Sequence, residues 1–180
     1  VPISCNDAVD GSAVGTFLQP KTRLGSPFVI AGMQQAISQG KKVVCGWEAN
    51  GGFLLGSNLC RKGKILRALP TRDAMLPIVC LLQQSVEKQL TLSQLMARLP
   101  RRFTRSVLLR HFPRSRGLQM VERFSSRQAS EERSIPPGLA DFFPSDLGFH
   151  PIAHIDTMDG LRITFTNREV AHIRPSGNAD

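Results

Sequence analysis

Aromatic residues are scarce in this sequence, which contains no tyrosine, one tryptophan and 6% aromatics in total. Sequence-specific RNA-binding modules usually stack bases on aromatic side chains. The scarcity of such side chains therefore argues against a nucleic-acid partner of that kind. An apolar fraction of 41% over 180 residues is still enough for one large or two small hydrophobic cores.

Long apolar runs are missing as well. The longest, residues 74–82, contains Pro77 and is much shorter than the roughly 20 residues of a membrane-spanning helix. We find no signal peptide, and we predict a cytoplasmic protein with no membrane partner. Residues 1–5 already have the pattern of a buried strand, which indicates a piece of a longer protein.

Closely spaced cysteine and histidine ligands are absent. The sequence has neither a C-x-x-C motif nor a histidine at metal-ligand distance from a cysteine, so we predict no metal site in this chain. We expect reduced, mostly buried thiols. The four cysteines are Cys5, Cys45, Cys60 and Cys80.

The histidines lack partners typical of a catalytic triad. None stands at a recognisable spacing from a serine or a carboxylate, so we expect hydrogen-bonded structural roles and no catalytic residue here. They are His111, His150, His154 and His172.

Acidic residues are outnumbered by 23 lysines and arginines to 14 aspartates and glutamates, which gives a net charge of +9. Such an excess favours an anionic partner. Much of it lies between Arg98 and Arg133. Three interpretations stay open: a solvated face, a nucleic-acid- or anion-binding module whose surface is residues 101–116, or the approach to a sugar-phosphate site.

The first part of the chain has the pattern of an α/β unit. Residues 1–5, 16–19 and 42–47 are predicted strands, residues 27–39, 71–88 and 92–98 are predicted helices, and residues 58–67 are a predicted basic loop. We expect Ser26, Thr71 and Thr91 to cap the helices. Five apolar residues of the second helix are expected to point inward: Met75, Ile78, Val79, Leu82 and Val86.

The pattern changes after Leu99-Pro100, where we place a domain boundary. Residues 103–112 are predicted to be extended, 113–124 helical, and 125–148 a polar, poorly ordered connection. Strands at 151–155, 161–165 and 169–173 would form a meander. The predicted fold class is therefore α/β: an incomplete three-layer α/β/α domain at 1–99, then a small α+β domain with an antiparallel sheet at 100–180.

Two apolar runs surround an Asn-Gly turn in residues 43–56, a pattern typical of a β-hairpin. Glu48 stands beside the turn as a lone carboxylate. On a glycine-rich turn, a carboxylate can accept hydrogen bonds from two neighbouring sugar hydroxyls. An ordinary hairpin is the simpler interpretation of these residues, and a sugar site is the alternative.

The chain ends on a second loop with binding chemistry. Arg174, Ser176 and Asn178 offer side-chain donors, and Gly177 allows backbone amides to approach an anion closely. These properties suit a phosphate cradle. An ordinary Pro-Ser-Gly-Asn turn is the alternative interpretation.

The order of these motifs resembles the α-D-phosphohexomutases, the phosphomannomutase/phosphoglucomutase family. The resemblance rests on G-x-E at 46–48, N-G at 50–51 and R-P-S-G-N at 174–178. Residues 22–25, Thr-Arg-Leu-Gly, match a family segment whose basic residue reaches toward the substrate, which makes Arg23 a candidate. A surface charge is the alternative role for that residue. The resemblance covers essentially the whole chain, as the C-terminal half of such an enzyme.

The resemblance implies an isomerase that interconverts hexose 6-phosphate and hexose 1-phosphate through a phosphoserine and a hexose 1,6-bisphosphate, with Mg²⁺ as cofactor. Neither the serine loop nor the metal loop of the family is found in this sequence. We therefore expect this chain to bind a hexose phosphate without turning it over, and to have the N-terminal domains of the same enzyme as its partner.

The resemblance also divides the site between the two predicted domains. Residues 1–99 would be the sugar-recognising third domain and residues 100–180 the phosphate-binding fourth domain. Asn50 stands where relatives commonly have serine, and a histidine of their loop is lacking, so the choice between mannose and glucose stays open. The implied ligands are Glu48, Asn50 and Arg23 for the sugar and Arg174, Ser176, Gly177 and Asn178 for the phosphate.

Overall fold

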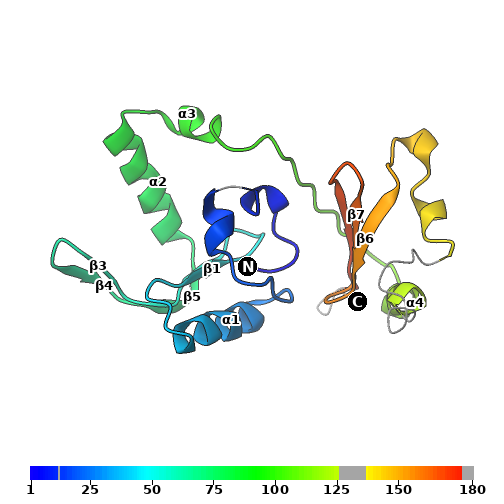
Figure 1. The fold of residues 1–180 in the computed structure, drawn as a ribbon, viewed down its shortest axis with the longest axis horizontal. Coiled ribbons are helices and arrows are strands. Elements are labelled where there is room, and N and C mark those ends of the chain that lie inside the picture. The colour runs from blue at the N-terminus through cyan, green and yellow to red at the C-terminus, as the bar shows by residue number, and fades with distance from the viewer. Residues whose placement is uncertain (12, 126–136, 176–180) are drawn as a thin grey trace. The chain divides into compact units, whose positions relative to one another are not determined.

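The structure is a computed structural model that describes residues 1–11, 13–125 and 137–175. The chain divides into two compact units, Val1–Arg105 and Ser106–Asp180, which are treated separately below (Figure 1). The first combines helices with small antiparallel sheets, and the second packs a helix on an antiparallel sheet. The predicted fold class is thereby confirmed, while the roles given to domains 1–99 and 100–180 stay predictions.

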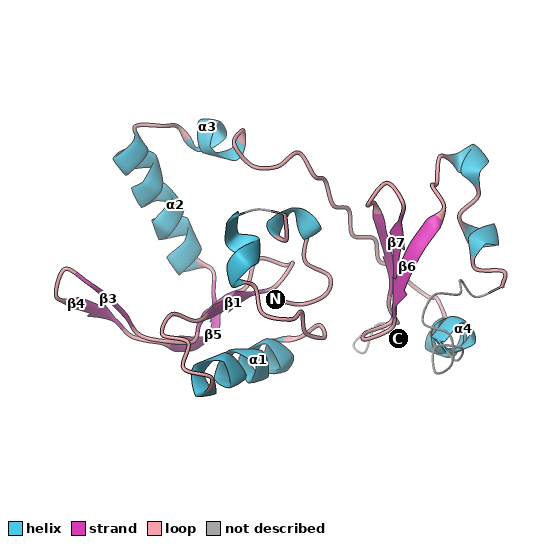
Figure 2. Cartoon of the chain, viewed as in Figure 1, coloured by secondary structure: helices cyan, strands magenta, loops and turns pink. Residues whose placement is uncertain are grey.

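The first unit is built on a three-stranded antiparallel sheet with strand order β1-β2-β5. One helix, α1, packs on this sheet (Figure 2). Its residues Val29, Met33 and Ala36 meet Val44 and Leu54 in the buried core. The bounds are α1 (Ser26–Ser38), β1 (Cys45–Trp47), β2 (Phe53–Leu55) and β5 (Leu69–Asp73).

The hairpin predicted at residues 43–56 is confirmed. β1 and β2 pair with Trp47 opposite Phe53, so that Glu48 follows directly after β1. The Glu48 amide donates to the Gly52 carbonyl at 2.8 Å, and the Gly51 amide donates to the Glu48 carbonyl at 3.0 Å. This turn fixes the backbone from which the Glu48 side chain departs.

The two strands predicted nearest the N-terminus are wrong. In residues 1–5 only Pro2 forms a bridge, a single parallel one to Thr22. Residues 16–19 lie at the end of a short 3₁₀ helix, η2 (Ala13–Phe17), and beyond it, while η1 (Asp7–Val9) precedes that helix. The side chain of Asn6 accepts from the Ala8 amide at 2.8 Å, a local bond that favours a turn over an extended strand.

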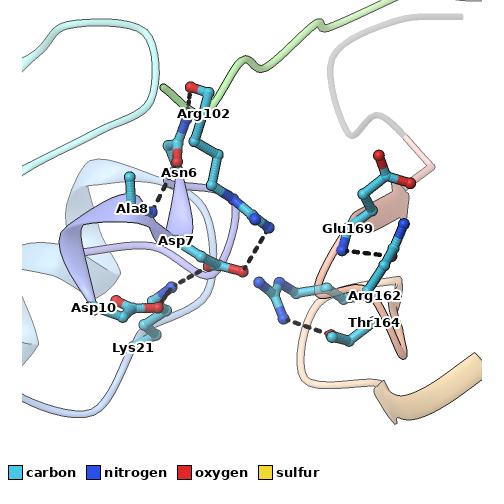
Figure 3. A network of polar contacts seen from close by, with 10 residues as sticks. Asn6, Asp7, Ala8, Asp10, Lys21, Arg102, Arg162, Thr164 and Glu169 are labelled. Atoms are coloured by element: carbon cyan, nitrogen blue, oxygen red, sulfur yellow. Dashed lines mark hydrogen bonds and ion pairs between the residues drawn. The ribbon is translucent and has the colours of Figure 1, made fainter. Parts of the chain in front are cut away.

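A polar network holds this N-terminal segment (Figure 3). The Lys21 ammonium lies 2.6 Å from Oδ1 of Asp7 and 2.7 Å from Oδ2 of Asp10. Nδ2 of the Asn6 side chain donates to the Arg102 carbonyl at 2.9 Å, and the Arg102 guanidinium lies 3.9 Å from Oδ2 of Asp7. The network thus joins the start of the first unit to residues near its end.

Residues 58–67 form a second hairpin, not the predicted basic loop. β3 (Leu59–Arg61) pairs antiparallel with β4 (Lys64–Leu66). The two residues between them, Lys62 and Gly63, have φ values of 50° and 74°. Two positive φ values in succession characterise the turn whose twist suits a two-residue hairpin, and Gly63 adopts one of them at no steric cost.

The long helix starts later than predicted. Thr71 belongs to β5, and α2 (Met75–Lys88) begins after Asp73, whose Oδ1 accepts from the amides of Met75 at 2.8 Å and Leu76 at 3.2 Å. Asp73 thus satisfies amides of the first turn that Thr71 was expected to serve. The cap predicted at Thr91 is confirmed, because α3 (Leu92–Met96) opens with a reciprocal capping box between Thr91 and Gln94.

The apolar residues of α2 are not inward-pointing, contrary to the prediction. The five side chains expected to be buried are between 48% and 78% exposed. The neighbour against which α2 packs most is α3, a short helix with no buried residue. Helical periodicity correctly placed these residues along the helix, but the described chain supplies no surface that covers them.

The second unit has a sheet of order β6-β7-β8, all antiparallel, with one helix, α4, against β7. The three predicted strands and the helix are confirmed to within one residue at each end. Phe124 of α4 and Leu161 and Ile163 of β7 are at most 1% exposed. The bounds are α4 (Arg114–Ser125), β6 (Ile152–Asp156), β7 (Leu161–Phe165) and β8 (Val170–Ile173).

The segment before β6 is more ordered than predicted. Residues 126–136 lie outside the described part, but residues 137–148 contain η3 (Ala140–Phe142) and η4 (Ser145–Leu147). Leu139 is fully buried, and Phe143 packs on the same core. The core of the second unit therefore includes residues that their polar surroundings in the sequence had led us to treat as a connection.

Residues 103–109 contain neither helix nor strand.

Candidate functional site

Glu48 is the buried charged side chain of the described chain, with 7% of its surface exposed. Its Oε2 accepts a hydrogen bond from the Ser26 hydroxyl at 2.9 Å and lies 2.8 Å from Nε of Arg72. The same Nε lies 3.0 Å from Oγ of Ser26, so the hydroxyl accepts from the arginine and donates to the carboxylate. Three side chains from three different elements therefore meet at one carboxylate oxygen.

The sequence prediction missed two of these three residues. Ser26 was expected to cap α1, but the cap residue is Gly25, which forms no side-chain bond, and Ser26 lies inside the first turn. Arg72 was placed in a helix and lies on β5, which pairs with β2. Along a short strand, the side chains of Thr71, Arg72 and Asp73 alternate between the two faces of the sheet. This alternation was the one local signal that could have placed Arg72 on the same face as Glu48.

The other two predicted sugar ligands lie on exposed loops of the first unit. Oδ1 of Asn50 accepts from the Gly52 amide at 3.1 Å, so this side chain shapes the turn beside Glu48. Arg23 is exposed in the loop that leads into α1, three residues ahead of Ser26. The hydrogen bond and the ion pair of the Glu48 side chain go to Ser26 and Arg72, not to Arg23. Their joint action on a ligand stays a prediction.

Of the predicted phosphate ligands, the structure describes Arg174, while Ser176, Gly177 and Asn178 lie outside the described residues. Arg174 follows β8 and is exposed. Its Nε donates to Oδ1 of Asp159 at 2.9 Å. Asp159 belongs to the turn between β6 and β7, which the sequence analysis had not connected with the phosphate loop.

The arginines between residues 98 and 133 differ in their surroundings. Arg102 belongs to the polar network of the first unit, where it lies near Asp7 (Figure 3). It is therefore not simply a free surface cation. Five others in the run have exposed side chains: Arg101, Arg105, Arg110, Arg114 and Arg116.

The described aspartates of the second unit are not gathered in a cluster that could hold a metal ion. In residues 1–11, 13–125 and 137–175, no three histidine, cysteine or acidic side chains come together in a group that could hold a metal ion. Oδ1 of Asp156 accepts from the Met158 amide at 2.8 Å, and Asp159 pairs with Arg174.

The cysteines are free but mostly exposed, which corrects the prediction of mostly buried thiols. Cys5 is buried, and Cys45, Cys60 and Cys80 are exposed. Burial raises the pKa of the Cys5 thiol, and desolvation also raises the pKa of the Cys45 thiol.

Within the described part of the chain, no helix is both long and apolar enough to cross a bilayer.

Comparison with known proteins decides the family. The family model of phosphoglucomutase/phosphomannomutase, alpha/beta/alpha domain III, matches residues 2–103. The chain belongs to the phosphoglucomutase/phosphomannomutase family. The matched residues include Arg23, Glu48 and Asn50 together with Ser26 and Arg72, so the polar cluster around Glu48 lies within domain III. The family predicted from the sequence motifs is thereby confirmed.

Two relatives of this chain are named phosphomannomutases. The protein of Salmonella muenchen is 38% identical over 185 residues, which cover 99% of this chain and 34% of the relative. The protein of Sinorhizobium fredii (strain NBRC 101917 / NGR234) is 39% identical over 180 residues, which cover 99% of this chain and 35% of the relative. The chain thus spans about a third of the length of these relatives.

Proposed function

We propose that this chain is the substrate-binding portion of a phosphohexomutase, an isomerase that interconverts hexose 6-phosphate and hexose 1-phosphate. The observation that carries the proposal is the buried carboxylate of Glu48, fixed by Ser26 and Arg72 inside a domain III of this family. Burying a carboxylate costs free energy unless the group is paired. A carboxylate held beside a glycine-rich turn can accept hydrogen bonds from sugar hydroxyls in place of water. Glu48 therefore binds the sugar.

The arrangement around Glu48 suits a diol. Both protein contacts fall on Oε2, which leaves Oε1 to accept a hydrogen bond from a ligand hydroxyl. Asn50 and Arg23 complete the proposed sugar site from exposed loops. The two lone pairs of Oε1 can accept from two neighbouring hydroxyls, and the fixed carboxylate selects their orientation. Because both named relatives are phosphomannomutases, a mannose phosphate is the first ligand to test.

Arg174 binds the non-transferring phosphate in this proposal. The guanidinium offers five N–H donors in a planar fork, and Asp159 engages the one on Nε. The terminal nitrogens can therefore face an anion, with Ser176, Gly177 and Asn178, which follow in the sequence, as further proposed donors. The positive charge of the chain would raise the local concentration of the dianionic substrate.

Transfer of the phosphoryl group is assigned to other parts of the enzyme. The phosphoserine, the hexose 1,6-bisphosphate intermediate and Mg²⁺ belong to the proposed reaction of the parent protein, and the proposal places the residues that hold them outside this chain. Positioning and charge stabilisation dominate phosphoryl transfer. The contribution of this chain is to hold the sugar and the distal phosphate, and the chain by itself binds without turnover.

The N-terminal domains of the same enzyme are the proposed partner. The two relatives are about three times as long as the stretch they share with this chain. The apolar side of α2 supports this proposal, because its residues are exposed in a helix that the rest of the first unit does not cover. Burial of such a side by further protein would be favourable at about 25 cal/mol per Å² of apolar surface.

Trp47 offers a direct test of the sugar site, because it is the single tryptophan and precedes Glu48. We expect mannose 6-phosphate to change its fluorescence saturably. The change should weaken in Glu48→Gln and persist in Glu87→Gln, which alters an exposed carboxylate of the same unit. Equal titrations of all three proteins would contradict the proposal. Binding of nucleic acid that falls steeply with salt, with no response to the sugar phosphate, would favour the nucleic-acid- or anion-binding module.

A further inference from the structure

The turn between β6 and β7 is joined to the loop that carries Arg174 by side-chain and backbone contacts. β7 and β8 pair with Leu161 opposite Ile173, so residues 159–160 lie directly beside residue 174. Asp159 accepts from Nε of Arg174 at 2.9 Å, and its side chain is only 16% exposed against 37% for Arg174. The less exposed carboxylate therefore anchors the more exposed guanidinium.

A second bond fixes Asp159 itself. Nε2 of His172 lies 2.7 Å from the Asp159 carbonyl oxygen. Because a carbonyl oxygen can only accept, His172 must carry its proton on Nε2 in this bond. The imidazole thereby ties β8 to the backbone of the turn, two residues before Arg174.

A close backbone approach completes the junction. Gly160 has φ of +87°, and a Cβ atom placed on it would lie 2.4 Å from the Ile173 carbonyl oxygen and 3.1 Å from the Arg174 Cα atom. Real Cβ atoms essentially never lie within 3.0 Å of another atom, so the approach to the Ile173 oxygen leaves no room for a side chain. The turn and the start of the Arg174 loop can therefore lie this close only because residue 160 is glycine.

We propose that Asp159 is a positioning residue for phosphate binding, which holds the Arg174 side chain so that its two terminal nitrogens are presented to the anion. A guanidinium uses one edge for Nε and the other for the terminal pair. With Nε engaged by Asp159, the described residues offer no hydrogen-bond partner to the terminal nitrogens of Arg174. The inference rests on the proposed function, in which Arg174 is a phosphate ligand.

Preorganisation is the physical benefit of this arrangement. An arginine has many rotamers, and immobilising such a side chain on binding costs about 0.5 to 1.5 kcal/mol. A residue that holds the arginine in the free protein lowers that cost. Without Asp159, phosphate affinity should accordingly fall by about two- to tenfold.

The experiment uses the whole 180-residue chain, labelled with ¹⁵N, and inorganic phosphate as the probe. Affinity is followed by NMR through the Nε–H signal of Arg174 and, in variants at that position, through backbone amide signals. We expect Asp159→Ala to weaken binding about two- to tenfold and Asp159→Asn, whose amide oxygen still accepts from Nε, to retain most of the affinity. The matched control is Asp156→Ala, which removes a carboxylate from the same turn region without touching Arg174 and should leave binding unchanged.

Two further variants keep the test decisive. Arg174→Lys preserves the charge, but an ammonium group lacks the planar fork that contacts Asp159 and the anion at once, so we expect this variant to bind phosphate more weakly. This variant supplies the test should Asp159→Ala fail to fold. Unchanged or tighter binding of phosphate to Asp159→Ala, or full affinity of Arg174→Lys, would overturn the inference about Asp159 and leave the proposed function intact. Unchanged phosphate binding in Arg174→Ala, followed through backbone amide signals, would overturn the proposed function and the inference together.

Discussion

Glu48 and Arg72 form an ion pair of 2.8 Å in which the carboxylate is buried and the arginine side chain is 58% exposed. The two residues come from the turn after β1 and from β5, and the Ser26 hydroxyl lies between them. Loss of Glu48 would leave the Ser26 hydroxyl without its acceptor and Arg72 with only the Ser26 oxygen. Loss of Arg72 would leave the buried carboxylate without its positive partner.

Glu48 should therefore contribute to stability even without a ligand. We predict that Glu48→Ala lowers the free energy of unfolding by about 1 to 3 kcal/mol, the cost of breaking a buried, charge-assisted hydrogen bond. Urea denaturation measures this change. The control is Glu87→Ala, which breaks an exposed pair with Arg61 at 3.5 Å and should cost less than about 1 kcal/mol. Equal effects of the two substitutions would show that the Glu48 cluster has no special role in the fold.

Gly160 allows a test of the junction between the β6–β7 turn and the Arg174 loop. Gly160 and Gly148 share a φ of +87°, but a Cβ atom on Gly148 would meet nothing within 4 Å. Both alanine substitutions carry the backbone strain, and only Gly160→Ala adds the collision with Ile173. We predict that Gly160→Ala lowers the melting temperature further than Gly148→Ala and shifts the NMR signals of Arg174. Equal melting temperatures would contradict the close approach.

The cysteines should differ in reactivity. The thiolate is the reactive form, and the pKa of the thiol is raised by burial at Cys5 and by desolvation at Cys45. We predict that maleimide labels the exposed Cys60 and Cys80 before Cys45, and Cys5 last, as followed by mass spectrometry at pH 8. Early labelling of Cys5 in the native protein would contradict its buried position.

The same thiols give stability a pH dependence. Their pKa values in the folded protein lie above the ordinary value of 9.0, so the folded state keeps protons that the unfolded state loses. Stability is therefore unaffected well below pH 9 and falls as the pH rises past about 9. Urea denaturation of the native chain and of Cys5→Ser should show a smaller decline in the variant, and identical pH profiles would contradict this origin.

The apolar side of α2 predicts where the rest of the enzyme makes contact. Hydrogen exchange of α2 amides should slow when this chain is mixed with the preceding part of the Salmonella muenchen phosphomannomutase. Replacement of Ile78 and Leu82 by glutamine should abolish the slowing without lowering the stability of the isolated chain, because both side chains are about half exposed. Unchanged exchange on mixing would count against α2 as the contact surface.

Sequence reasoning succeeded where local chemistry decides the structure. The Asn-Gly turn after Glu48, the capping box at Thr91 and the three strands of the second unit each follow from residues close together in the chain. The family motifs were local as well, which is why the family could be recognised before the structure was known.

The errors arose where distant residues decide. Ser26 is a good capping residue by type, but a carboxylate 22 positions later takes its hydroxyl. The periodicity of α2 predicts an apolar side, but whether that side is buried depends on which surfaces lie against it. Asp159 gave no local sign of its contact with Arg174, because the pairing of β7 with β8 creates that contact.

The central proposal is that Glu48 binds the sugar of a hexose phosphate and that Arg174 binds a phosphate group. The most direct test measures, by NMR titration of the whole chain, the affinities of mannose 6-phosphate and of inorganic phosphate for the native protein, Glu48→Gln and Arg174→Ala. We predict that both substitutions weaken the sugar phosphate and that only Arg174→Ala weakens inorganic phosphate. Unchanged affinity for mannose 6-phosphate in both variants would contradict the account.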